Sequence, residues 1–274
     1  RRDLVIVQFT VSISLAIGTL AVYQQIQFAK NRPAGYSSER MIQLRARSPE
    51  YFGKYQVLRT ELKNTGVVEE IAEANYPVTS FLGWNGGFSW KGQPIGPTFN
   101  TIFVTPEYGK TVGLEFTRGR DFSREIQSDE SGILLNESAV KEMGLVNPIG
   151  EYLTWAPGGT LRGTYQIIGV AKDMVKGSPF DQTYPSVMFY SKNDQEWLYI
   201  KIKEGVSPHE ALPKIKEVYT RLIPSAPFDY NFSDEEYAAK FRAEERVGSL
   251  AGIFSFLAIL ISCSGLFGLA SFTA

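Results

Sequence analysis

Both ends of the chain are long and uncharged, and this feature most constrains how the chain can fold. Residues 4–28 read LVIVQFTVSISLAIGTLAVYQQIQF, and residues 247–274 contain no Asp, Glu, Lys or Arg. At about 1.5 Å of rise per residue, a helix of either length crosses the roughly 30 Å hydrocarbon core of a bilayer. The sequence therefore predicts a transmembrane helix at each end of the chain.

A signal peptide is the alternative for residues 1–28, because it also begins with positive charge. Its apolar region would be only about 7 to 15 residues long and would end at a small-residue cleavage site. Residues 4–28 are longer and lack such a site. A spanning helix is therefore the favoured interpretation. Because the chain starts at Arg1 without a methionine and is still apolar at Ala274, we expect it to be part of a larger membrane protein.

Small residues recur four positions apart in the second uncharged segment. Ala251 and Ser255 show this spacing, and so do the four candidate packing residues, Gly248 with Gly252 and Ser264 with Gly268. This spacing lets helix backbones approach closely in lipid, although glycine is also simply common in membrane helices. We expect these four residues to pack against membrane helices.

The segment before the second span, residues 234–246, contains strong helix formers and no glycine or proline. It predicts one helix that continues into the span over residues 234–274. Tyr237 and Phe241 would share a face of this helix, with Ala239 between them, and a stiff helix of this kind could couple the membrane to the domain outside it. The simpler alternative is a stabilising juxtamembrane turn.

Charge and cysteine content suggest where the central part of the chain lies. Arg1 and Arg2 favour a cytoplasmic N-terminus, and two spans then place residues 29–246 outside the cytoplasm. The one cysteine, Cys263, lies in the second span, so residues 29–246 contain no cysteine. This suits an oxidising compartment, where a free thiol would be a liability. Lys and Arg number 28 against 29 Asp and Glu, so no basic field favours nucleic acid.

The central part predicts an α+β fold built from two β-α-β units. In the first unit, strands at 41–46 and 67–75 flank an amphipathic helix. In the second unit, strands at 198–202 and 228–232 flank a helix capped by Ser207, and Pro213 suggests that this helix begins near Glu210. Because more than a hundred residues separate the units, we expect a split domain, residues 29–105 and 197–233, with residues 106–196 as an inserted lobe.

The inserted lobe is predicted to be mostly β-structure. Strands are expected at 133–135, 152–155, 165–171 and 187–190, with a short helix that begins after Asn136. The stretch 84–92 reads WNGGFSWKG, which predicts either a hairpin with its tryptophans packed on the sheet or an exposed binding loop.

No motif nominates a catalytic, cofactor or metal site. The strings GxxxxGK[ST], GxSxG, HExxH and CxxC are absent, and the one histidine, His209, is expected on the surface. The sequence therefore predicts no catalytic, cofactor-binding or metal-binding residues. Solvated or turn positions are expected for five acidic residues, which are Asp121, Asp129, Glu130, Asp173 and Asp181.

Several strings, in this order, resemble the MacB/FtsX-like ABC transporter permeases, especially two-domain permeases of the Bacteroidetes type. They are the first span with Gly35-Tyr36 after it, TRGRDF at 117–122, ILLNESA at 133–139, GLVNPIG at 144–150, YQIIGVAKD at 165–173 and the span ending SGLFGLA at 270. The resemblance covers nearly the whole chain. It implies that residues 29–246 form a periplasmic domain in two parts, a porter-like subdomain and an inserted, mostly β subdomain, in agreement with the split domain.

The resemblance also implies a function and partners. It implies a non-catalytic permease segment of the bacterial inner membrane, a separate cytoplasmic ABC ATPase, a second permease copy in a dimer, and a periplasmic adaptor or substrate protein or peptide. Relatives export substrates, extract lipoproteins or regulate a periplasmic partner. The alternative is the ligand-sensing domain of a bacterial transmembrane receptor, and a membrane-anchored enzyme is a third reading.

Overall fold

The computed structural model describes residues 2–32, 34–37, 39–46, 48–80, 83–91, 93, 96–160, 162–177, 180 and 182–273. The chain divides into two compact units. The helical unit comprises Arg1–Arg32 and Ala238–Ala274, and the periplasmic unit, as we name it from the predicted orientation, comprises Pro33–Tyr237. Arg1, Asp181 and Ala274, to which predictions above refer, lie outside the described residues.

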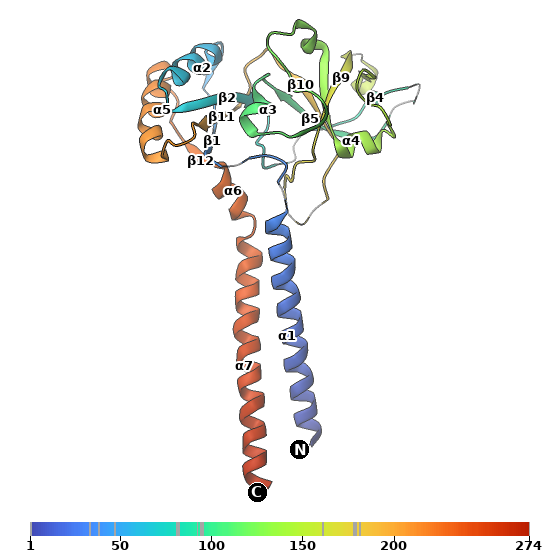
Figure 1. The fold of residues 1–274 in the computed structure, drawn as a ribbon, viewed down its shortest axis with the longest axis vertical. Coiled ribbons are helices and arrows are strands. Elements are labelled where there is room, and N and C mark those ends of the chain that lie inside the picture. The colour runs from blue at the N-terminus through green and yellow to red at the C-terminus, as the bar shows by residue number, and fades with distance from the viewer. Residues whose placement is uncertain are drawn as a thin grey trace. The chain divides into compact units, whose positions relative to one another are not determined.

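The helical unit consists mainly of α1 (Arg2–Asn31) and α7 (Arg242–Thr273), which run side by side in opposite directions (Figure 1). The segments Phe9–Asn31 and Arg242–Gly268 are long and apolar enough to cross a membrane, with mean hydropathies of 1.3 and 2.2. Most of their large apolar side chains are exposed. Such exposure suits lipid rather than water, as expected of the predicted spans.

Within the described residues, the periplasmic unit is built on one mixed sheet of 12 strands with helices around it. The strand order is β12-β1-β11-β2-β5-β10-β7-β9-β8-β4, with β3 on β5 and β6 on β9. Its strands are β1 (Met41–Arg45), β2 (Val68–Ala74), β3 (Trp84–Asn85), β4 (Phe88–Ser89), β5 (Phe99–Val104), β6 (Phe116–Gly119), β7 (Gly132–Asn136), β8 (Tyr152–Trp155), β9 (Gly163–Ala171), β10 (Ser186–Tyr190), β11 (Trp197–Ile202) and β12 (Tyr230–Phe232). Its helices are α2 (Tyr55–Asn64), α3 (Tyr108–Val112), α4 (Glu137–Glu142), α5 (Pro208–Leu222) and α6 (Ser233–Ala239), with 3₁₀ turns at Pro49–Tyr51, Gln127–Ser131 and Pro157–Gly159.

The two predicted β-α-β units are present and together form one end of the sheet. β1 lies between β11 and β12, and β11 pairs with β2, so strands from the two units alternate. Leu58 and Leu62 of α2 and Ile215 of α5 share one core with Ile42 of β1. The prediction of an α+β fold is confirmed.

The start of α5 differs from the prediction. Ser207 caps the helix, as predicted, by accepting a hydrogen bond from the Glu210 N–H, but α5 begins at Pro208 and includes Pro213. The first four N–H groups of a helix have no partner within it, so Pro208 loses nothing. Pro213 removes one later hydrogen bond, and packing of Ile215, Val218 and Tyr219 in the core offsets that loss.

The predicted strands and helix of residues 106–196 are present. Asn136 caps α4 by accepting a hydrogen bond from the Ala139 N–H. Phe88, Leu135 and Trp155 belong to a core in this part of the sheet. This core already joins residues 29–105, through Phe88, to residues 106–196, and a second core that includes Ala74 and Met188 does the same, so the two-lobe division stays a prediction.

The prediction of a hairpin at 84–92 is wrong. β3 pairs with β5 whereas β4 pairs with β8, so the two short strands do not pair with each other. Trp90 is buried and donates its indole N–H to the Met143 carbonyl, but Trp84 is 44% exposed. Distant partner strands, which local turn chemistry does not reveal, decide this pairing.

The prediction of one uninterrupted helix over 234–274 is also wrong. α6 ends at Ala239 and α7 begins at Arg242, with Lys240 and Phe241 in a turn between them. The Phe241 N–H bonds the Ala238 carbonyl, and the Phe241 carbonyl accepts the Glu245 N–H. Phe241 is buried, and this packing overrides the favourable local helix propensity.

Candidate functional site

Paired hydroxyl groups join α1 to α7 within the helical unit. The Ser12 and Ser262 Oγ atoms lie 2.8 Å apart, and Thr19 Oγ1 lies 2.8 Å from Ser255 Oγ. Gly248 and Ile26 form a third, apolar pair. A Cβ added to Gly248 would lie 3.5 Å from the Ile26 Cδ1, so the two helices approach closely there. We call these six residues the seam.

Each helix contributes seam residues seven positions apart. On α1 they are residues 12, 19 and 26, and on α7 they are residues 262, 255 and 248. A seven-residue repeat returns to nearly the same helix face, so two antiparallel helices can keep one line of contact. In hydrocarbon a hydroxyl finds no water partner, and an interhelical hydrogen bond contributes about 0.6 to 2 kcal/mol.

The seam includes only one of the four small residues predicted to pack in the membrane. Gly248 faces Ile26, and Gly252 lines the same space of about 740 Å³ between the helices, although nothing would meet its Cβ. Ser264 and Gly268 are exposed. Their packing against further helices stays a prediction. Ser262 was missed as a site residue, and Ser255 was singled out only for its spacing of four from Ala251. The seven-residue spacing is the signal that would have found both.

A disulfide can test the seam directly. With Cys263 replaced by Ser, we expect the Ser12→Cys/Ser262→Cys variant to oxidise to an intrachain disulfide in membranes, because the two Oγ atoms already lie in contact. Gel mobility with and without reductant measures this. Ser12→Cys/Ser264→Cys is the control and should stay reduced, because Ser264 is exposed. Equal oxidation of both variants would contradict the seam.

At the other end of this helix pair, charged groups join α1 to the start of α7. Lys30 forms an ion pair with Glu245, and its ammonium group lies 5.8 Å from the centre of the Phe241 ring. The ion pair is exposed, so it contributes about 1 kcal/mol or less. The ion pair therefore adds little stability, but it brings the end of α1 next to the first turn of α7.

The three candidate coupling residues therefore occupy different places from those predicted. Tyr237 lies in α6, where its ring packs edge-on against Tyr36 at 6.3 Å, and Ala239 ends that helix. Phe241 lies in the turn after α6, so Tyr237 and Phe241 do not share a helix face. Glu236 of α6 accepts a hydrogen bond from Thr79 at 2.7 Å, which attaches α6 to the periplasmic unit.

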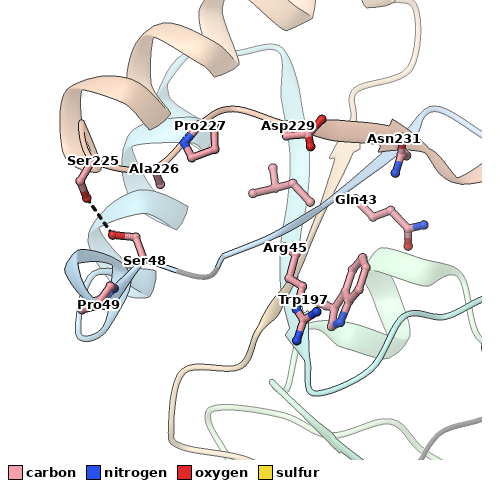
Figure 2. Close-up of a pocket in the computed structure, with 11 residues that line it drawn as sticks. Gln43, Arg45, Ser48, Pro49, Trp197, Ser225, Ala226, Pro227, Asp229 and Asn231 are labelled. Atoms are coloured by element: carbon pink, nitrogen blue, oxygen red, sulfur yellow. Dashed lines mark hydrogen bonds between the residues drawn. The ribbon is translucent and has the colours of Figure 1, made fainter.

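The periplasmic unit has a cleft of about 630 Å³ where β12 diverges from β1 (Figure 2). Trp197 and Arg45 form one wall, with the Arg45 guanidinium 5.9 Å from the indole ring, and the Ser48 and Ser225 hydroxyls meet at 2.8 Å. Asp229 is the one acidic residue of the lining. The described lining therefore offers mainly apolar and hydrogen-bonding surface, and the Ser225 hydroxyl donates a 2.6 Å hydrogen bond to the Glu50 carboxylate.

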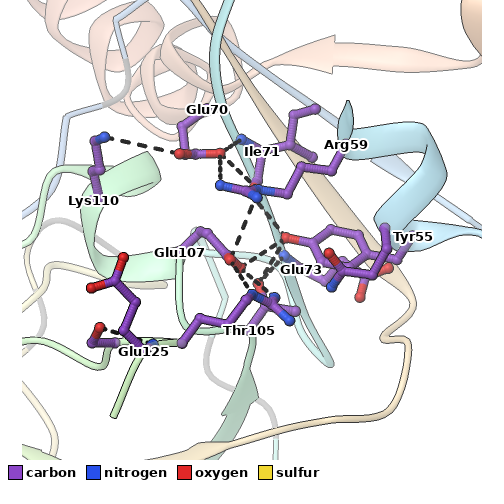
Figure 3. Close-up of polar contacts among 12 residues, drawn as sticks. Tyr55, Arg59, Glu70, Ile71, Glu73, Thr105, Glu107, Lys110 and Glu125 are labelled. Carbon is purple, nitrogen blue, oxygen red and sulfur yellow. Dashed lines mark hydrogen bonds and ion pairs between the residues drawn. The ribbon is translucent and has the colours of Figure 1, made fainter. Parts of the chain in front are cut away.

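A polar cluster lies beside α2, β2 and the start of α3 (Figure 3). Glu107 accepts two hydrogen bonds from Arg124, at 2.8 and 3.1 Å, and one from the Tyr55 hydroxyl at 3.1 Å. Burial raises the pKa of Glu107, but the hydrogen bonds and charge of Arg124, with Arg59, outweigh this effect and lower the pKa. Glu70 forms ion pairs with Arg59 and Lys63. These acids are therefore held by cations rather than free to react.

Glu73 differs from its neighbours because, among the described residues, no Lys or Arg forms an ion pair with it. Its carboxyl accepts hydrogen bonds from the Tyr51 hydroxyl and from the Gln195 N–H. Burial, with the nearby charge of Asp194, raises the pKa of Glu73 to about 9, so the carboxyl is protonated at neutral pH. An unfolded chain would lose this proton near pH 4.5.

Glu73 should therefore make the periplasmic unit less stable as pH rises. Between about pH 4.5 and 9 the folded state holds a proton that the unfolded state has lost, so the free energy of unfolding falls with pH, by at most about 1.4 kcal/mol per unit. Urea unfolding of a soluble 33–237 fragment measures this slope. Glu73→Gln should flatten it, whereas Glu69→Gln, at an exposed position of β2, should not. Equal slopes in all three proteins would contradict the buried neutral carboxyl.

Of the two roles predicted for these acids, solvated or turn, Asp129 has the second, because it lies in the 3₁₀ turn Gln127–Ser131 but not in solvent. It is fully buried and accepts two hydrogen bonds from Arg120, both at 2.6 Å. Asp173 is half-buried and accepts four hydrogen bonds, from Asn136, Ser138 and Thr183, so it is neither solvated nor in a turn. Within the described residues, no three His, Cys, Asp or Glu side chains lie close enough together to hold a metal ion.

Comparison with known proteins identifies the family. Residues 6–218 match the family model described as the MacB-like periplasmic core domain. The crystal structure of the periplasmic region of MacB from Actinobacillus actinomycetemcomitans is 14% identical, with a TM-score of 0.53 over 77% of this chain and 96% of that chain. A domain assigned to a permease protein from Porphyromonas gingivalis is 18% identical, with a TM-score of 0.43 over 60% and 68% of the two chains. The comparison with curated proteins finds no match.

The family match spans α1 and most of the periplasmic unit, and the MacB structure shares its fold. It agrees with the resemblance drawn from the sequence strings and with the two apolar helices beside the domain. The chain therefore belongs to the family of MacB-like periplasmic core domains, which are parts of ABC transporter permeases.

Proposed function

We propose that this chain couples ATP hydrolysis by a separate cytoplasmic ATPase to work in the periplasm. That work is export or extraction of a substrate, or regulation of a periplasmic partner. The family supports the general role, because a MacB-like permease implies an ABC ATPase and a second permease copy. In this proposal α1 and α7 cross the inner membrane and residues 29–246 are periplasmic. An adaptor or a substrate protein would bind the periplasmic unit.

The seam is the observation that carries the proposal. α1 and α7 are joined at three levels by the pairs Ser12–Ser262, Thr19–Ser255 and Ile26–Gly248. Helices joined in this way resist sliding, because sliding would separate the interhelical hydroxyl pairs and leave Thr19 and Ser262 only their hydrogen bonds to carbonyls of their own helix. The chain passes from the helical unit to the periplasmic unit at residues 32–33 and 237–238. A displacement of the helix pair therefore reaches the periplasmic unit through both connections.

A flexible insertion tests this coupling. We expect a Gly-Gly-Ser-Gly-Gly insertion between Ala239 and Lys240, in the full-length permease with its ATPase, to abolish the transport-dependent phenotype. Expression and basal ATP hydrolysis should stay near the wild-type level. A flexible linker uncouples the position of α7 from that of α6. A proline at Ala239 would be a weaker test, because the helix is already interrupted after this residue.

The control carries the same insertion between Gly158 and Gly159. Both glycines lie in an exposed turn with open space around them, so the control should keep full activity. A fully active 239/240 variant would refute coupling through this connection. Loss of ATP hydrolysis together with transport would place the defect in assembly of the complex and would also count against the proposal.

A further inference from the structure

We propose that the contacts of Tyr55 and Arg59 with Glu107 form a latch that holds the two predicted lobes of the periplasmic unit in one orientation. The latch spans the predicted boundary, because Tyr55 and Arg59 belong to residues 29–105 whereas Glu107 belongs to residues 106–196. The proposal rests on that two-lobe division and is independent of the coupling through α6 and α7.

The sheet is weakest between β2 and β5. β5 falls within residues 29–105 by sequence, but it pairs with β10 along its length, so in this proposal it moves with residues 106–196 and the lobes meet between β2 and β5. β2 pairs with β5 at one position, Ala74 opposite Val104. By contrast, β2 pairs with β11 over most of its length, and β5 pairs with β10 at five positions. The short β2–β5 ladder is therefore the place where the sheet can bend with the smallest loss of backbone hydrogen bonds.

One face of this junction is apolar and can act as a pivot. Ala72 and Ala74 of β2 lie in the same core as Ile102 and Val104 of β5 and Met188 of β10. Apolar contact has no preferred direction, so it survives a small rotation of one lobe against the other. This core would keep the lobes attached while their orientation changes.

The opposite face carries directional contacts that cross the boundary. Glu73 alternates with Ala72 and Ala74, which places it on this face. The Tyr55 hydroxyl donates to Glu107 Oε2 at 3.1 Å, and Arg59 Nε lies 3.8 Å from Glu107 Oε1. Two further hydrogen bonds cross the boundary, from the Gly53 N–H to Asp194 and from the Gln195 N–H to Glu73 at 3.3 Å. A rotation about the pivot would lengthen all of these contacts together.

Arg124 prepares Glu107 for the latch. Its two hydrogen bonds fix the plane of the Glu107 carboxylate, and its charge helps to keep that group ionised. Hydrogen bonds to an ionised group are about twice as strong as neutral ones. The latch is therefore ionic, and a change that neutralises Glu107 or removes Arg124 should release it.

The latch lies beside a polar cleft of about 410 Å³ that both lobes line. Tyr55 and Glu73 line it from one lobe, and Arg124, Tyr190 and Lys192 line it from the other. Separation of the lobes would widen this cleft. Release of the latch would therefore change the surface that the periplasmic unit presents to other molecules.

Spin-label distances in the complete 274-residue chain can test the latch. Labels at Val57→Cys and Val146→Cys, in a Cys263→Ser background, report one position in each lobe, since both side chains are exposed. We expect one narrow distance in the parent. Glu107→Gln and Arg124→Gln should each raise the ratio of a second, longer distance to the first by about tenfold, because each removes a charge-assisted contact.

Lys172→Gln is the matched control, because Lys172 also forms a 2.6 Å ion pair, with Glu115, but both partners lie in residues 106–196. It should leave the distance distribution unchanged. If circular dichroism shows that Arg124→Gln is unfolded, Tyr55→Phe replaces it as the test of the latch. This variant removes only one hydroxyl and should also raise the population of the longer distance. An unchanged distribution in every folded variant, or an equal change in the control, would overturn the latch.

Discussion

Replacing Gly35 with alanine is expected to destabilise the periplasmic unit by about 3 kcal/mol or more. Gly35 has φ of 76°, a left-handed conformation that costs other residues about 1 to 2 kcal/mol. A Cβ at this position would also overlap the backbone carbonyl oxygen of Asp173. Backbone atoms cannot rotate away as a side chain can, so overpacking adds about 1 to 3 kcal/mol. Urea unfolding of the 33–237 fragment measures the change.

Gly66 provides a control that separates the two effects. Its φ is 74°, nearly the same as that of Gly35, but nothing lies within 4 Å of the position of its Cβ. Gly66→Ala should therefore cost only the conformational part, about 1 kcal/mol. Equal losses in the two variants would show that the contact between Gly35 and Asp173 contributes nothing.

Replacing Asp173 with alanine is expected to cost about 2 to 4 kcal/mol of the same unfolding free energy. The Asp173 carboxylate accepts hydrogen bonds from the Asn136 side chain at 2.7 Å, from the Ser138 N–H and hydroxyl at 2.9 and 2.6 Å, and from the Thr183 hydroxyl at 2.9 Å. Each bond to a charged acceptor contributes about 1.5 to 3 kcal/mol, but the remaining partners can in part bond one another or water. Asp173 thus ties the end of β9 to the start of α4.

A graded series distinguishes this role from loss of volume. Asp173→Asn keeps the size and one acceptor oxygen, so we expect it to cost about half as much as Asp173→Ala. Glu137→Gln, also in the first turn of α4, is the control and should change stability little, because Glu137 is exposed. If Asp173→Ala changed stability no more than Glu137→Gln, these hydrogen bonds would have no net stabilising effect.

Much of the fold could be predicted from local pattern. Val187–Tyr190 and Tyr152–Trp155 are short apolar or alternating runs bounded by turn residues, and the structure has strands at both places. Asn136 and Ser207 were recognisable as helix caps because a cap acts on its own next three residues. The apolar terminal helices followed from length and composition alone.

The errors arose where contacts distant in sequence decide the structure. Residues 84–92 look like a hairpin, but β3 pairs with β5 and β4 pairs with β8. The segment 234–246 has favourable helix propensity throughout, yet the packing of Phe241 interrupts it. Nothing local to Asp173 indicates its hydrogen bonds, because only the fold places Asn136 and Ser138 beside it.

The candidate site was predictable only in part. Spacing of four drew attention to Gly248 and Gly252, because small residues at that spacing are common where membrane helices meet. The partners on α1, Ser12 and Thr19, carry no such pattern by themselves. Their role becomes visible only when two antiparallel helices with seven-residue spacing are placed against each other.

The central claim is that α1 and α7 move as one body when the ATPase works. The most direct measurement is the transport-dependent phenotype of full-length permease carrying Ser12→Cys/Ser262→Cys in the Cys263→Ser background, oxidised in membranes and then reduced. The account predicts full activity in both states, because the disulfide joins residues that already stay in contact. Loss of activity on oxidation and recovery on reduction would show that the helices move past each other, and would contradict the account.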